Sequence, residues 1–245
     1  CAFEGCSLLR SISIPDSVTE IGAFAFYDCT SLTTIKIPDS VTTIGGAAFS
    51  GCTSLTTAPE LPATTLTDFC YQYMFNGCTS LTTAPELPAM TLANYCYCYM
   101  FNHCTSLTSA PDLPATTLFN YCYRYMFQYC WNLTTAPELP ATTLADSCYS
   151  AMFNECKLIT EAPKLPAMTL TRECYKSMFS KCSSLKSAPE LPATTLAISC
   201  SEEMFRGCRS LTNAPDLPAT TLVNYCDYNM FYGCESLKEI KLPNS

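Results

Sequence analysis

The chain has 245 residues and a formal net charge of −8, with 13 lysine and arginine residues against 21 aspartate and glutamate residues. Nucleic acids and anionic membrane surfaces are bound through clustered basic side chains, so this balance argues against both as partners. The sequence has no apolar run long enough to cross a bilayer, and we expect no direct membrane insertion.

Cysteine recurs at a fixed distance along the whole chain. The landmark cysteines are Cys6, Cys29, Cys52, Cys78, Cys104, Cys130, Cys156, Cys182, Cys208 and Cys234. Their first two intervals are 23 residues long and the remaining seven are 26 residues long. Such a period predicts a solenoid, in which each unit buries its apolar face only by stacking on its neighbours.

The unbroken period predicts one elongated solenoid domain. Short 23-residue units occupy residues 1–51, seven 26-residue units occupy residues 52–233, and a partial unit occupies residues 234–245. Both ends cut through a unit and neither carries a capping repeat. We therefore expect the chain to be a fragment of a longer protein.

Each unit begins with a segment that alternates between inward and outward side chains. In the unit that starts at Cys52, we expect Leu55, Ala58 and Leu61 to point inward, and Thr57 and Glu60 to point outward. Every long unit also carries two prolines, which cannot donate to a strand ladder. The predicted parallel strands are therefore only three or four residues long.

The segment after the second proline has the spacing of an amphipathic helix. Its apolar residues, which share one helical arc, are Leu66, Cys70, Met74 and Phe75. Thr64 or Thr65 is available as the N-cap, and Gly77 stands where the helix would end. The short units carry Gly45 and Gly46 at the matching place, which predicts a tighter turn or a short helix.

The repeat resembles a known family. The segment AFYDCTSLTTIKIPDSVTTIG, residues 25–45, has the order of Phe, Cys, Leu, Ile-Pro and Ile-Gly found in the BspA-like, or Treponema-type, leucine-rich repeats of bacterial surface proteins. This resemblance implies an α/β solenoid with short parallel strands on one face and short helices on the other. It also implies an extracellular or surface-anchored protein of a host-associated bacterium, often an adhesin, without naming a ligand.

A second set of cysteines recurs in the long units. Its members, which align with Ile21 and Ile44 of the short units, are Cys70, Cys96, Cys122, Cys148, Cys174, Cys200 and Cys226. Because they replace core aliphatic residues, we expect two ladders of buried free thiols. Disulfides between stacked units remain an alternative, since equivalent Cα atoms would lie ~5 Å apart.

Neither a metal site nor catalysis is expected. Cys96, Cys98, His103 and Cys104 lie close in sequence, but no paired CxxC spacing accompanies them. His103 is the only histidine, and no glycine-rich phosphate loop is present. We therefore predict a non-enzymatic protein that needs no cofactor.

Aromatic residues gather at outward positions that vary between units. The candidate aromatic plate consists of Phe69, Tyr73, Tyr95, Tyr99, Tyr121 and Tyr125, with Tyr129 and Trp131 at its edge. Exposed aromatic clusters are typical of sugar-stacking or protein-binding surfaces, although packing between units is an alternative. Tyr71 and its equivalents recur in five units, and we expect them to pack at the margin of the core.

A row of acidic residues is the second candidate surface. It consists of Glu60, Glu86, Asp112, Glu138, Glu190 and Asp216 on the strand side, interrupted by Lys164. Stacked like charges repel, so such a row needs solvent, salt or a cationic partner. Solvation explains it most simply, and calcium or a basic partner is the alternative.

Two classes of function follow from these features. The first is an adhesin-like binding module that recognises a protein or glycan on a host or neighbouring cell. The second is a structural spacer or a filament or fibre element, whose partner would be further copies of itself. The aromatic plate favours the first class, and the uniform core favours the second.

Overall fold

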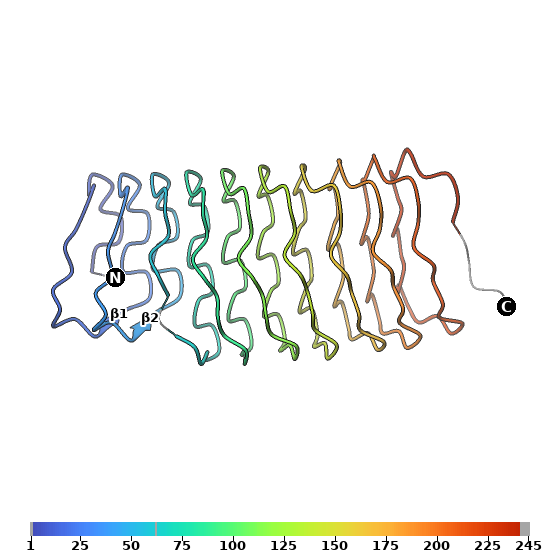
Figure 1. The fold of residues 1–245 in the computed structure, drawn as a ribbon, viewed down its shortest axis with the longest axis horizontal. Helices are drawn as coiled ribbons and strands as arrows, with labels where there is room; N and C mark the ends of the chain where they lie inside the picture. Colours follow the sequence, from blue (N-terminus) through green and yellow to red (C-terminus); the bar gives the residue numbers. More distant parts are fainter. Residues whose placement is uncertain (1, 62, 241–245) are drawn as a thin grey trace.

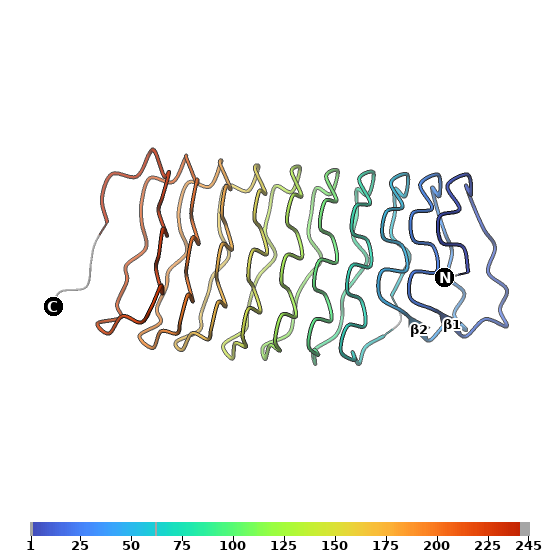
Figure 2. The same ribbon diagram turned by 180° about the vertical axis from the view of Figure 1, so that it is seen from behind.

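The structure is a computed structural model that describes residues 2–61 and 63–240. The chain forms an elongated stack of coils, with the two termini toward opposite ends (Figure 1). The predicted leucine-rich repeat solenoid is confirmed. Figure 2 shows the opposite side, where neighbouring coils follow the same zigzag course.

Parallel pairing between coils is shorter than the sequence predicts. Strands β1 (Glu20–Ile21) and β2 (Thr43–Ile44) pair in parallel, with Ile21 opposite Ile44. In the long units the pairing is reduced to isolated parallel bridges, such as Thr57–Thr83, Thr65–Thr91 and Thr117–Thr143. Each long unit has two prolines close to these bridges, and proline interrupts a ladder because it lacks an N–H group.

The predicted helices are wrong, because the described residues contain no helix and hence none that could cross a membrane. The segment expected to be helical forms consecutive turns instead. The Cys70 N–H donates to the Thr67 carbonyl at 3.2 Å, whereas the Tyr71 N–H donates to Cys96 of the next coil at 2.9 Å. This alternation continues to Cys78, so every second N–H bonds to the neighbouring coil rather than within a helix.

A positive φ angle at every fourth residue produces these turns. Phe69, Tyr73 and Gly77 have φ values of 63°, 56° and 74°. A positive φ at the third residue is the requirement of a type II turn, which Gly meets without strain and other residues meet at a cost. Gly77 is therefore the third left-handed position of its coil and not the end of a helix. We call this side of the solenoid the turn face.

The glycine pair of the short units also forms a turn, and the alternative of a short helix is wrong. Gly45 follows directly after β2 and packs closely against the preceding coil. A Cβ atom at position 45 would lie 2.4 Å from the backbone nitrogen of Ala23. Glycine is required there because two backbones approach each other.

The core is built from columns of identical side chains. Leu55 and Leu61 are buried, Ala58 is half-buried, and Thr57 and Glu60 are exposed, as predicted. A column of stacked phenylalanines has centroid spacings of 5.3–5.9 Å, and its members are Phe3, Phe26, Phe49, Phe75, Phe101, Phe127, Phe153, Phe179, Phe205 and Phe231. The parallel tyrosine column, Tyr71, Tyr97, Tyr123, Tyr149 and Tyr175, is only 1% exposed. These tyrosines lie deeper than the core margin that we predicted.

The cysteines form two ladders of free thiols, and no disulfide joins the described residues. In the landmark ladder each thiol donates to the carbonyl of a phenylalanine in the preceding coil, as in Cys104 Sγ to Phe75 O at 3.1 Å. In the second ladder such contacts are longer, as in Cys174 Sγ to Cys200 O at 3.9 Å. The landmark cysteine therefore gives a buried phenylalanine carbonyl a second hydrogen bond, since the Phe75 carbonyl also accepts from the Cys78 N–H at 3.1 Å.

The hydrogen bond of the landmark cysteine gives a test of its role. We expect Cys104→Ala to lower the free energy of unfolding by about 1–3 kcal/mol, because the fully buried thiol leaves a cavity and the Phe75 carbonyl loses one of its two hydrogen bonds. Cys104→Ser should recover part of this loss, whereas Cys174→Ser should be no better than Cys174→Ala. Denaturant unfolding of the four variants measures the differences, and equal behaviour of Ser and Ala at position 104 would refute the role.

The buried thiols also predict a dependence of stability on pH. Burial raises the pKa of Cys96 and Cys148 from the ordinary value of 9.0 to about 12. Since the folded-state pKa lies above the unfolded value, stability should be complete below pH 9 and should fall as the pH rises toward 12. Between pH 9 and 12, each such thiol would lower the free energy of unfolding by about 1.4 kcal/mol per pH unit.

Melting temperatures between pH 8 and 11, measured with reductant present, test this expectation. Alkylation of the native protein at pH 8.5 provides an internal control, because Cys6 is exposed and should react while the buried thiols stay unmodified. A constant melting temperature up to pH 11 would contradict the prediction.

Candidate functional site

The outward positions that vary between units coincide with the left-handed positions of the turn face. In three successive coils the first of these positions holds Phe69, Tyr95 and Tyr121, and the second holds Tyr73, Tyr99 and Tyr125. All six have φ values between 56° and 63°. The turn geometry therefore brings the predicted aromatic residues together in two columns, one coil above the next.

The rings of each column stack on one another. The centroid distances are 4.9 Å for Phe69–Tyr95, 4.5 Å for Tyr95–Tyr121, 4.7 Å for Tyr73–Tyr99 and 4.6 Å for Tyr99–Tyr125. These values match the spacing of ~4.8 Å between paired strands. The predicted plate is thus two aromatic ladders, in which neighbouring rings cover each other's faces. Solvent reaches mainly the ring edges, since the tyrosines are half-buried and Phe69 is 50% exposed.

Tyr129 and Trp131 belong to a separate group beside the ladders. Tyr129 occupies the third left-handed position of its coil and stacks on His103, with centroids 4.3 Å apart. Trp131 is 44% exposed, and the ammonium group of Lys157 lies 5.0 Å from its ring centre. His103 also contacts Asn102, its Nδ1 atom lying 2.5 Å from the Asn102 Oδ1 atom. From the sequence, His103 was considered only as a metal ligand, and its contact with Tyr129 was not predicted.

A further column of the turn face contains Arg124. Gln72, Cys98 and Arg124 each directly precede the second aromatic residue of their coil. Cys98 is buried, and Arg124 is half-buried with its guanidinium carbon 5.3 Å from the Tyr121 ring centre and 4.8 Å from that of Tyr125. Both distances fit cation–π contacts. Sequence reasoning did not select Arg124. The feature that could have indicated it is that no other lysine or arginine occurs between residues 37 and 156.

Burial disfavours ionisation of three ladder hydroxyls. It raises the pKa of Tyr99 to about 12, and the neighbouring Tyr125 and Tyr73 add to this shift while Arg124 opposes it. Burial likewise raises the pKa of Tyr73 and Tyr95. These three side chains therefore present phenolic hydroxyls that can donate or accept hydrogen bonds, close to the fixed cation of Arg124.

The ladders end where the sequence predicts. The next three coils carry small or charged residues at the same positions, namely Ser147, Ala151, Glu173, Ser177, Ser199 and Glu203. Charges on this part of the turn face are paired within the chain. Glu155 binds Lys181 at 2.6 Å, and Glu203 binds Arg206 at 3.0 Å.

The acidic row lies on the opposite part of the unit, as predicted. Glu60, Glu86, Asp112, Glu138, Glu190 and Asp216 are all exposed. None of them has an ion pair within residues 2–61 and 63–240. Within these two ranges no group of three or more His, Cys, Asp or Glu side chains is arranged to hold a metal ion. The geometry thus supports solvation of the row better than calcium bridging.

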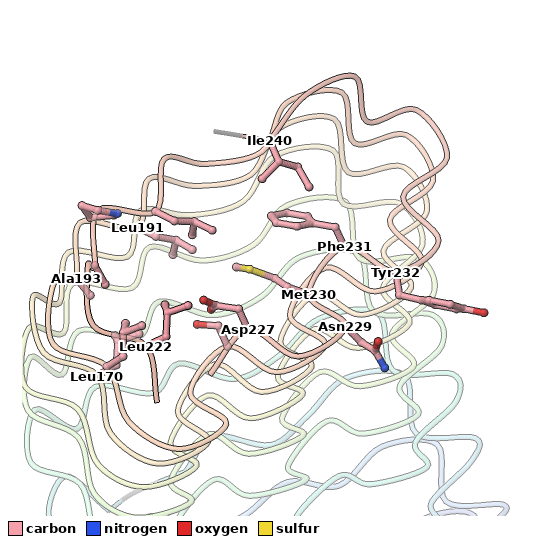
Figure 3. Close-up of a pocket in the computed structure, with 15 residues that line it drawn as sticks. Leu170, Leu191, Ala193, Leu222, Asp227, Asn229, Met230, Phe231, Tyr232 and Ile240 are labelled. Atoms are coloured by element: carbon pink, nitrogen blue, oxygen red, sulfur yellow. The ribbon is translucent and has the colours of Figure 1, made fainter. Parts of the chain in front are cut away.

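An apolar cavity of about 480 Å³ lies near the last described coils. Figure 3 shows Leu191, Leu222 and Met230 around it, with Ile240 across from Phe231. Asp227 is the only carboxylate in its lining, and burial raises the pKa of that carboxyl group. The cavity is lined mainly by core columns, so it offers no set of converging polar groups for chemistry.

Comparison with known proteins identifies the repeat. The family model described as BspA type leucine rich repeat region matches in six copies, over residues 1–134, 85–212 and 147–245. No curated protein matches the chain.

Three similar solved structures are leucine-rich repeat proteins of bacteria. A protein from Bacteroides ovatus is 24% identical, with 87% of this chain and 75% of that chain covered and a TM-score of 0.38. A cell surface protein from Faecalibacterium prausnitzii is 20% identical, with 96% and 79% covered and a TM-score of 0.36. The T. pallidum leucine rich repeat protein is 22% identical, with 72% and 67% covered and a TM-score of 0.37. Because the family model extends over all of its repeats, the chain belongs to the BspA-type leucine-rich repeat family.

Proposed function

We propose that the protein is a non-enzymatic binding module, located outside the cell or on its surface, that contacts a partner protein through the two aromatic ladders. One observation carries this proposal. Six aromatic side chains occupy left-handed positions of the turn face that are small or charged in the following coils. Family membership supports the surface location, and an adhesin-like role on a host or neighbouring cell is the form of the proposal that we favour.

The fold does not require aromatic residues at these positions. The coils that carry Ser147, Ala151 and Ser177 there have the same turn geometry, with φ values of 53°, 51° and 53°. Left-handed backbone costs a non-glycine residue about 1–2 kcal/mol whatever its side chain. Stacking stabilises the fold by about 0.5–1.5 kcal/mol per aromatic pair, so packing accounts for part of the preference for aromatic residues at these positions. It does not explain why three adjacent coils carry rings at both of these positions.

Ring orientation favours a protein over a glycan as the partner. A sugar stacks on an open aromatic face, but here the faces of Tyr95 and Tyr99 are covered on both sides by neighbouring rings. The accessible edges and hydroxyl groups suit the mixed apolar and hydrogen-bonding contacts of a protein interface, where tyrosine and arginine are enriched. A glycan would find an uncovered aromatic face only at the ends of the ladders, as at Phe69.

The second candidate function is a structural spacer or filament element. It is favoured by the phenylalanine column, which continues without a break from Phe3 to Phe231. Such a column gives length and rigidity and needs no ligand. In that case the ladders would contribute stability only, or would contact another copy of the chain.

A double substitution separates these functions. We expect Tyr99→Ala with Tyr125→Ala to weaken binding to a partner found on an array of extracellular host proteins by at least about tenfold, because both hot-spot rings are removed. Tyr225→Ala is the matched control. Tyr225 occupies the first left-handed position of its coil, is 64% exposed and lies outside the ladders. Unchanged binding together with a lower melting temperature would instead assign the ladders to packing.

A further inference from the structure

Arg124 is a cation without a counter-ion. Within the described part of the chain no carboxylate lies within ion-pair distance of it, whereas Lys176 and Arg206 on the same face each have a glutamate partner. Its Nε atom is buried and has no hydrogen-bond partner. Its Nη2 atom makes one long hydrogen bond, to the Tyr125 hydroxyl at 3.5 Å. The guanidinium therefore has most of its donors unused.

The contacts around Arg124 leave part of its hydrogen-bonding capacity unused. Two cation–π contacts stabilise its charge but accept no hydrogen bond in the plane of the guanidinium. Its buried Nε donor has no partner, which is unfavourable. The fold does not require arginine here, because the equivalent positions in adjacent coils hold Cys98 and Ser150, both buried. The unused donors of Arg124 therefore need another explanation.

The unused donors match one kind of ligand. A guanidinium presents a planar fork that binds a carboxylate through two parallel hydrogen bonds. The Tyr125 hydroxyl group lies 3.5 Å from its Nη2 atom and can donate a further hydrogen bond to the same ligand. We propose that Arg124 binds the carboxylate of a single Asp or Glu side chain on the partner protein, as the charged anchor of the surface formed by the aromatic ladders. This inference rests on the proposed binding function.

Charge balance favours one carboxylate over a polyanion. Residues 37–156 hold one cation, Arg124, and eight acidic residues: Asp39, Glu60, Asp68, Glu86, Asp112, Glu138, Asp146 and Glu155. Polyanions such as nucleic acids or sulfated glycans are held by several cations acting together. A single arginine within a negatively charged region can neutralise one anionic group only.

Peptide selection tests the inference without knowledge of the natural partner. A display library of random 12-residue peptides is selected on the whole chain, and we expect the binders to share one Asp or Glu. Replacing that acid by its amide, or making Arg124→Gln, should each weaken binding by about tenfold or more. The two changes together should weaken it no further, since both remove the same contact. Arg172→Gln, at an exposed arginine outside the ladders, is the matched control and should bind normally.

The outcomes separate this inference from the proposed function. If Tyr99→Ala with Tyr125→Ala abolishes peptide binding while Arg124→Gln and the amide peptide do not weaken it, the carboxylate contact is overturned and the binding surface stands. If none of these changes weakens binding, both proposals fail. The amide peptide is measured on the unaltered protein, so a folding defect of Arg124→Gln cannot obscure the result. Binding of free N-acetylneuraminate that depends on Arg124, with no acidic residue enriched in the peptides, would overturn the assignment to a protein side chain.

Discussion

The structure depends on backbone hydrogen bonds that connect each coil to the next. On the turn face every second N–H group donates to the following coil, at distances such as 2.9 Å for Phe75 N to Met100 O. The intervening N–H groups close turns within their own coil. Because both sets are satisfied, neighbouring coils are held at strand-like spacing with almost no regular secondary structure. A helix on this face would remove the bonds between coils.

This spacing places the same side chain of successive coils in direct contact. Apolar and aromatic residues gain from such stacking, which explains the columns of phenylalanine, buried tyrosine and cysteine. Stacked residues of like charge repel one another, and the sequence avoids this repulsion in two ways. On the turn face charged residues alternate in sign, as in Glu155 and Lys181, and on the strand side the acidic row is exposed to solvent. Arg124 follows neither rule, and its neighbours are tyrosine rings.

The helix prediction failed for an identifiable reason. The apolar residues Leu66, Cys70 and Met74 recur every fourth residue, which is close enough to the helical period of 3.6 to fit one arc. The left-handed positions Phe69, Tyr73 and Gly77 keep strictly to a spacing of four over the same segment. The aromatic residues at these positions did not indicate a left-handed backbone, since a positive φ is usually found at glycine or asparagine.

The sequence by itself determined the solenoid, the family, the inward and outward positions of the strand side, and the three coils in which aromatic residues gather. These features follow from the period and from comparison of the units with one another. Only the tertiary structure decided that the turn face has no helix, that the rings stack face to face, and that Arg124 lies against two of them without a carboxylate. The first two depend on contacts between residues 25 or 26 positions apart, which spacing within one unit does not reveal. The third depends on the turns that bring Arg124 against Tyr121 and Tyr125 of its own coil.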